Sequence, residues 1–212
     1  MAAEYRVALA LGATVALVQA SGREAARLVP DKRLGSAERL LPLPADSASV
    51  RAYVGVASVS LPEDLREAVA KGLHNEFKTA RETELRPEEP RLAEWETLLP
   101  EYRESTLRQA DDTFAKLALV GLEVVAGEEP PIFATGEDDV ELLAEIEPGR
   151  WVVERLLSGW RWGPAKDVKP RVSPYLVPWD ELPDGIRKWD SVFIRAIPES
   201  LAGLGYEVRK KA

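Results

Sequence analysis

The second half of this chain repeats a pattern that is already present in its first half. The run WETLLPEYRE begins at Trp95 and matches WDELPDGIRK, which begins at Trp179, at an offset of 84 residues. Each copy ends in a short run typical of a strand, LEVV in the first and YEVR in the second. Such a repeat predicts a pseudo-twofold pair that shares one core, with a cleft along the axis. The same offset relates Leu98 to Leu182, Arg103 to Arg187, Leu117 to Leu201 and Gly121 to Gly205.

The spacing of apolar residues from position 60 onward is helical. In the first such segment, Leu65, Val69, Leu73 and Phe77 recur every four residues, which places them on one face of a helix. Glycines follow the later segments at the positions where helices commonly end. The sequence therefore predicts four helices, at residues 60–80, 102–120, 137–157 and 183–204.

Residues 1–58 have a different pattern, typical of a small α/β segment. A helix ends near Leu11, and the β-branched run from Thr14 to Gln19 is typical of a strand in a parallel sheet. A short helix over 23–29 and a second strand over 40–43 follow. Because one or two parallel strands cannot bury both faces, this segment packs on the helical part or on another chain, or belongs to something longer.

The predicted fold is therefore mainly α (α+β), with tandem helical repeats, short β segments and a preceding α/β segment. The predicted division is a partial α/β segment at 1–58 and a tandem repeat domain at 59–212. Within the second domain, copy one covers 59–127 and copy two covers 128–212.

Composition excludes several classes of function. A net charge of -8 argues against binding to a nucleic-acid backbone. The chain has no cysteine and one histidine, which excludes disulfides, thiolate or His-rich metal sites and cysteine nucleophiles. The apolar run over 7–20 is too short to span a bilayer and has no basic leader. We therefore expect a cytoplasmic protein that does not bind to membranes, metals or cofactors.

Residues 147–208 contain an aromatic helix, Gly-Trp-x-aromatic-Gly, a basic loop, Pro-x-Leu-Val-Pro-aromatic, Leu-Pro and a closing Leu-Gly-aromatic. This pattern resembles that of the ryanodine-receptor (RyR) domain. Residues 60–125 look like a degenerate partner copy, and the whole resembles a tandem pair of bacterial or phage type. Residues 1–58 resemble the tail of a Rossmann-like nucleotide-sensing domain that bacteria fuse to these repeats. The matching positions are Gly159, Trp160, Trp162, Gly163, Asp167, Lys169, Pro174, Leu176, Val177, Pro178, Trp179, Leu182, Pro183 and Gly205.

The sequence departs from the family pattern on the leading helix of each copy, where His-x-x-Trp is usual. Copy one has His74 and Phe77, and copy two has Pro148 and Trp151. The missing histidine at 148 argues against a symmetric role for that side chain. Proline also lacks the N–H that would bond to the carbonyl of residue 144, so we expect a kink.

A ligand site is predicted from two pairs of residues. Phe77 with Arg81, and Trp151 with Arg155, each place a ring and a guanidinium on one helix face. Facing each other, the two pairs could hold a purine and its phosphates. The resemblance implies the same place, because channel members of the family are thought to hold adenine-nucleotide-like ligands between their copies. The predicted ligand-binding residues are His74, Phe77, Arg81, Arg150, Trp151, Arg155, Trp160, Trp162 and Lys169.

Each of these residues also has a structural interpretation. Phe77 and Trp151 suit a core, with the arginines paired to Glu76 and Glu154. His74 suits a hydrogen-bonded core partner rather than a general base. The basic loop from Trp160 to Lys169 could bind an anion or stack on nucleic acid, and the favoured interpretation is that Trp160 and Trp162 pin it onto the helices. The acidic pairs 111–112 and 138–139 point apart on a helix and are interpreted as structural, and 21–23 as a plain strand-to-helix turn.

The sequence favours a non-catalytic sensor module that binds a small adenine-nucleotide or ADP-ribose-like ligand between the two repeats. The alternative is a protein-interaction module in which residues 1–58 complete a sheet in a homo-oligomer or with a partner domain. No nucleophile–base pair, metal set or phosphate loop is visible in the sequence, which argues against an enzyme.

Overall fold

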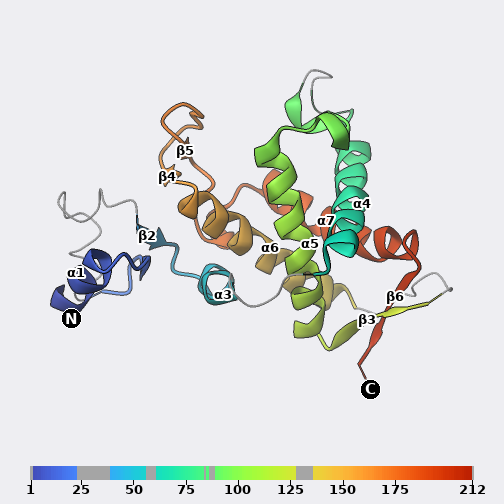
Figure 1. The fold of residues 1–212 in the computed structure, drawn as a ribbon, viewed down its shortest axis with the longest axis horizontal. Coiled ribbons are helices and arrows are strands. Elements are labelled where there is room, and N and C mark those ends of the chain that lie inside the picture. The colour runs from blue at the N-terminus through green and yellow to red at the C-terminus, as the bar shows by residue number, and fades with distance from the viewer. Residues whose placement is uncertain are drawn as a thin grey trace. The chain divides into compact units, whose positions relative to one another are not determined.

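The computed structural model describes residues 2–22, 39–55, 61–83, 85, 89–127 and 136–211. These residues contain six α-helices, three 3-10 helices and six short strands (Figure 1). The prediction of a mainly helical fold with short β segments is confirmed. The chain divides into two compact units, each made of two separate stretches. Unit one combines Met1–Val56 with Glu147–Pro183, and unit two combines Ala57–Ile146 with Asp184–Ala212.

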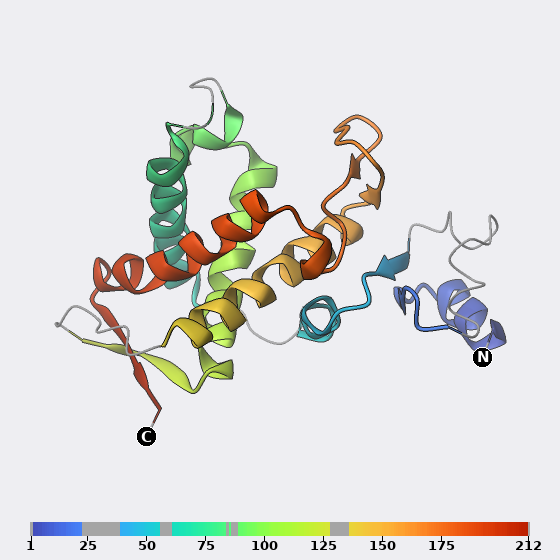
Figure 2. The same cartoon turned by 180° about the vertical axis from the view of Figure 1, so that it is seen from behind.

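Unit two is built on three long helices. They are α4 (Glu63–Arg81), α5 (Pro100–Leu119) and α7 (Asp184–Ala202), close to the predicted bounds. α4 packs against both α5 and α7, and Figure 2 shows α7 running across α4. The apolar spacing read from the sequence accounts for the contribution of α4 to this packing, because Val69 and Leu73 of its predicted face are buried. The core includes Val69, Leu73, Leu117, Ile194, Ile197 and Leu201.

A two-stranded sheet connects the ends of α5 and α7. Strand β3 (Leu122–Ala126) pairs antiparallel with β6 (Tyr206–Lys210). Gly121 and Gly205 have positive φ values of 72° and 77°, which lets each helix end and its strand begin within a tight turn. The extended runs were predicted, but their pairing with each other was not.

The N-terminal part of unit one contains α1 (Ala2–Ala10), β1 (Val15–Val18), β2 (Leu40–Leu43) and α3 (Ser47–Gly55). The two strands are parallel, as predicted, with Val15 opposite Leu40. α3 was not predicted, although Asp46 caps it by accepting a 2.6 Å hydrogen bond from the backbone N–H of Ser49. The predicted helix at 23–29 lies outside the described residues.

Helix α6 (Glu137–Leu157) has the predicted bounds, and its residues from Glu147 onward belong to unit one. The helix continues through Pro148. The next residue, Gly149, lies so close to α3 that a Cβ there would overlap the backbone of Ala48. This part of α6 forms a buried cluster together with β2, α3 and the loop that follows α6. The cluster consists of Leu41, Leu43, Ala52, Val152, Val153, Leu156 and Leu176.

Several short elements were not predicted. The 3-10 helices are η1 (Pro90–Leu92), η2 (Trp95–Thr97) and η3 (Trp179–Glu181), and the loop after α6 contains the short strands β4 (Arg161–Trp162) and β5 (Val172–Ser173). Among the described residues, no helix combines the length and the hydropathy needed to cross a membrane.

Candidate functional site

Arg81, the last residue of α4, lies close to two aromatic rings within unit two. The Cζ atom of Arg81 is 5.7 Å from the ring centroid of Phe77, one helical turn away. It is only 3.8 Å from the ring of Trp189 on α7, which is stacking distance. The sequence predicted the Phe77–Arg81 pair and missed Trp189. The spacing of Trp189 and Phe193, which puts two rings on one face of α7, is the signal that could have pointed to it.

A second cluster of the same kind lies in unit one. The Cζ atom of Arg155 is 5.5 Å from the ring centroid of Trp151 and 5.5 Å from that of Trp160. Both tryptophans are partly buried and pack against the buried cluster of unit one. The structure therefore brings together three of the predicted residues. It also supports part of the structural interpretation, because Trp151 belongs to a core.

The end of α6 explains why Trp160 lies beside Arg155. The N–H of Gly159 donates to the carbonyl of Leu156 at 3.1 Å, and the N–H of Trp160 donates to the carbonyl of Arg155 at 2.9 Å. These two bonds, with the positive φ of Gly159 (83°), form a Schellman motif. The motif turns the chain back onto the last turn of the helix. The predicted glycine stop thus also positions an aromatic residue of the cluster.

Arg150, one of the predicted ligand-binding residues, forms ion pairs with two carboxylates. Its Nη1 and Nη2 atoms each lie 2.9 Å from an oxygen, one of Glu154 and one of Glu147. Both glutamates are buried, and Arg150 compensates part of their negative charge within the helix. Arg155 also lies 3.9 Å from Glu154, which is the pairing that the structural interpretation expected. An anion would have to compete with these carboxylates for Arg150.

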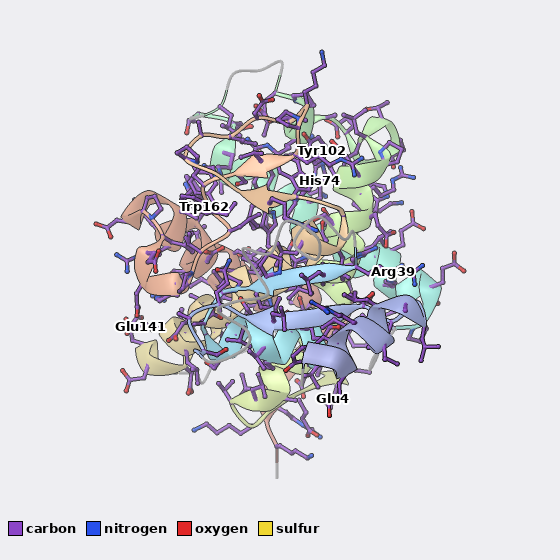
Figure 3. The ribbon with its side chains drawn as sticks, turned by 90° about the vertical axis from the view of Figure 1, so that its left-hand side faces the viewer. Glu4, Arg39, His74, Tyr102, Glu141 and Trp162 are labelled. Carbon is purple, nitrogen blue, oxygen red and sulfur yellow. The ribbon has the colours of Figure 1, made fainter. Side chains whose placement is uncertain are left out.

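His74 is buried and hydrogen-bonded. Its Nε2 atom lies 2.8 Å from the carbonyl oxygen of Ala93, and because a carbonyl can only accept, this nitrogen carries the proton. The ring also contacts Trp95, with the two centroids 5.9 Å apart at an angle of 58° (Figure 3 labels His74). This geometry favours the core-partner interpretation of His74 over that of a general base.

Two exposed glutamates next to this region have lowered pKa values. The indole N–H of Trp95 donates to Glu67, and this hydrogen bond, followed by the charge of Lys71, lowers the pKa of Glu67. The pKa of Glu94 is lowered by its hydrogen bond and charge interaction with Lys78, 2.6 Å away. Both groups are therefore carboxylates at neutral pH and do not serve as general acids.

The basic loop after α6 requires a correction. Trp162 was expected to pin the loop onto the helices together with Trp160, but it is 57% exposed. Only Trp160 packs inward. The loop is held instead by Arg161, which donates to the carbonyls of Leu156 (3.2 Å) and Trp160 (2.7 Å). Burial lowers the pKa of Arg161, and Lys169 is exposed at the far end of the loop.

The acidic pairs have structural roles where the structure describes their contacts. Asp111 accepts hydrogen bonds from the backbone N–H of Leu61 at 3.1 Å and from Arg66 at 2.8 Å. Asp112 lies 3.3 Å from the Nζ atom of Lys116, which is fully buried. Asp138 and Asp139 lie in the first turn of α6, where negative charge is favourable. Within the described ranges, no group of three or more acidic or histidine side chains is placed to hold a metal ion.

Comparison with known families identifies one part of the chain. Residues 134–210 match the family model of the RyR domain. This stretch, which is less than half of the chain, runs from α6 to β6. This part of the chain is therefore similar to an RyR domain, in agreement with the resemblance seen in the sequence. Trp151, Arg155, Trp160 and Trp189 lie inside the matched stretch, whereas Arg81 lies outside it.

Proposed function

We propose that this chain is a non-catalytic binding module made of two RyR-type repeats, which holds a small adenine-nucleotide or ADP-ribose-like ligand. The observation that carries the proposal is the stacking of Arg81 on Trp189 at 3.8 Å. In the predicted division, Arg81 belongs to copy one and Trp189 to copy two. The cation–aromatic contact thus lies on the boundary between the proposed copies, where the ligand was expected.

Two features support the tandem arrangement. Each proposed copy contains the series helix, 3-10 helix, helix and strand, as α4, η2, α5 and β3 and then as α6, η3, α7 and β6. In the β3–β6 sheet, Val124 pairs with Val208, and these residues are related by the same 84-residue offset as the two repeat tryptophans. A local two-fold axis through this pair would exchange the two strands and preserve every pair in the register.

The chemistry of the Arg81 cluster suits a nucleotide. A guanidinium that stacks by its face keeps its N–H donors at its edge, where they can bind phosphate oxygens bidentately. Phe77 and Trp189 supply ring faces on which a purine can stack. In our proposal the Trp151–Arg155–Trp160 cluster binds the same class of ligand by the same chemistry.

The runner-up is a protein-interaction module that assembles through residues 1–58. The observation in its favour is the two-stranded parallel sheet β1–β2, since isolated parallel strands are rarely stable without covered faces. Leu11 and Val54 are also 81% and 73% exposed in this part of the chain. As part of this proposal, residues 1–58 are the tail of a Rossmann-like sensing domain. The protein is also proposed to be cytoplasmic.

A thermal-shift panel of ATP, AMP, cyclic AMP and ADP-ribose on the full chain tests the binding proposal. A ligand at a hundredfold excess over its dissociation constant stabilises the fold by about 2.7 kcal/mol, which raises the melting temperature by several degrees. We expect Arg81→Met to reduce this shift to the part that the Arg155 cluster contributes, and Arg108→Met, at an exposed arginine of α5, to preserve it in full. If no member of the panel raises the melting temperature, the binding proposal fails and the interaction module stands. Turnover of a nucleotide by the pure protein would contradict the non-catalytic part.

A further inference from the structure

The loop of residues 160–173 differs in charge from the rest of the chain. It contains four basic residues and one acidic residue, in a chain whose net charge is -8. Two of its apolar side chains face solvent, because Trp162 and Val168 are 57% and 63% exposed. Tryptophan and arginine are enriched at protein–protein interfaces, where buried tryptophans often carry much of the binding energy. The binding proposal above uses Trp160 of this loop and neither Trp162 nor Val168.

The loop has a fixed internal structure rather than being held only at its ends. The backbone groups of Asp167 and Val172 exchange two hydrogen bonds, at 2.8 and 2.9 Å, and Gly163 donates to Ser173 at 3.2 Å. Arg171 has a positive φ of 56° and donates from its side chain to the carbonyl of Ser158 at 2.8 Å. A loop that is already ordered loses less conformational freedom when it binds. The exposed side chains are thus presented on a preformed support.

One exposed face of α6 has the complementary composition. Asp138, Glu141, Leu142 and Glu145 are spaced so that they form a single stripe along the helix, and all four are exposed. Leu142, 45% exposed, lies in the middle of the stripe. Figure 3 labels Glu141, one of the residues of this stripe.

The acidic stripe has no internal charge compensation in the part of the chain that the structure describes. Glu137, at the start of the helix, pairs with Arg195, but no described basic side chain pairs with Asp138, Glu141 or Glu145. Three unpaired carboxylates near an exposed leucine match a loop that carries two exposed lysines and an exposed tryptophan. The loop and the stripe therefore carry opposite charges, and each also exposes an apolar side chain.

We propose that the basic loop of one molecule docks on the acidic stripe of α6 in a second copy of this chain. Trp162 would cover Leu142, while Lys166 and Lys169 would lie against Glu141 and Glu145. Exposed ion pairs contribute little free energy, so the tryptophan supplies most of the affinity and the charges select the partner and the register. Because the two surfaces differ, the contact is heterologous, and copies can join into closed rings or open chains.

Sedimentation velocity of the full chain, from micromolar to millimolar concentration, measures the proposed association. We expect the average mass to rise with concentration and Trp162→Ala to weaken this association at least tenfold or so. Added salt should weaken it as well, because the charges lie at the surface. If the copies associated instead through apolar contacts of residues 1–58, added salt would leave their affinity unchanged or increase it.

Charge reversal gives the sharpest form of the test. The double variants Glu141→Lys/Glu145→Lys and Lys166→Glu/Lys169→Glu should each remain monomeric, because like charges would then face each other. An equimolar mixture of the two should associate again, since each loop then meets a stripe of opposite charge. The matched control Glu199→Lys/Lys211→Glu reverses exposed charges elsewhere and should behave like the natural chain.

Two outcomes would overturn the proposal. One is a natural chain that stays monomeric up to millimolar concentration. The other is association that the charge-reversed variants retain, or that their mixture fails to restore. Circular dichroism melts of each variant separate these outcomes from misfolding. All the substituted side chains are exposed, so we expect melting temperatures close to that of the natural chain.

Discussion

Arg81 and Arg155 occupy the same place in the two proposed copies, yet they are held differently. Each arginine has an aromatic residue one helical turn before it, Phe77 or Trp151. The second ring comes from a distant helix for Arg81 and from the adjacent turn for Arg155. Trp151 also packs on the buried cluster of unit one. The comparison teaches that a local pair sets the position of the arginine, whereas tertiary packing decides how tightly it is stacked.

The largest expected difference between the two clusters is in stability. Trp151→Ala removes a large ring that packs against the buried cluster of unit one and should lower the free energy of unfolding by about 3 kcal/mol. Phe77→Ala removes a smaller ring, which is partly buried as Trp151 is, and should cost about 1 kcal/mol. Urea denaturation of both variants measures the difference. Equal losses would mean that the two positions are packed alike and that the comparison is wrong.

The next largest effect concerns the glycines of the two leading helices. Gly149→Ala places a methyl group against the backbone of Ala48 and should cost about 2 kcal/mol, because backbone cannot easily move aside. A Cβ added at Gly72 would have the Cβ atom of Ser200 as its nearest neighbour, at 3.4 Å, which is an ordinary contact distance. Because alanine also has the higher helix propensity, Gly72→Ala should be neutral or slightly stabilising. Thermal melts of the two variants should therefore shift in different directions. A neutral Gly149→Ala would contradict the close approach of α6 and α3.

A smaller effect should appear in the coupling between ring and guanidinium. A double-mutant cycle with Arg81→Met and Trp189→Leu should give a coupling of about 1 kcal/mol, since the guanidinium stacks at 3.8 Å. The same cycle for Arg155 and Trp160, at 5.5 Å, should give about half as much. Chemical denaturation of the single and double variants provides both values. A stronger coupling in the second pair would reverse the comparison.

The smallest effect is a shift in acid titration beside the Arg81 cluster. Lys78 lowers the pKa of Glu94, so this carboxylate stabilises the fold above the pKa of an unfolded glutamate and loses that effect as the pH falls through its own lower value. Lys78→Met should raise the pKa of Glu94 toward the ordinary value and remove this dependence. Carboxyl-detected NMR titration below pH 5 or so measures both. An unchanged midpoint would show that Lys78 is not the partner of Glu94.

The local elements could be predicted from the sequence, because their signals are local. Apolar spacing and glycine stops located α4, α5, α6 and α7 within a few residues. A β-branched run located β1, and the leucine-rich run at 40–43 located β2. The Schellman turn at Gly159 was implied by the same glycine rule. The match of residues 134–210 to the RyR domain covers the short motifs, from Gly159 to Gly205, on which the sequence resemblance rests.

The rest depends on contacts between distant segments. Nothing near Trp189 in the sequence indicates that it stacks on Arg81, and the β3–β6 pairing also joins segments far apart. Trp162 and Trp160 are almost adjacent and both aromatic, yet one is exposed and the other packs on a core. The ion pairs of Arg150 could not be predicted either. The sequence places Glu147 three residues before it and Glu154 four residues after it, but other pairings are equally compatible with the spacing, and the structure shows which ones form.

The indole N–H signals of the six tryptophans give the most direct test of a ligand bound by the two arginine clusters. We predict that ADP-ribose or ATP, added to the ¹⁵N-labelled full chain, shifts the signals of Trp189, Trp151 and Trp160 saturably. The signal of Trp95, whose N–H is bonded to Glu67, should stay in place. Signals of Trp189, Trp151 and Trp160 that do not move at millimolar nucleotide would contradict the account.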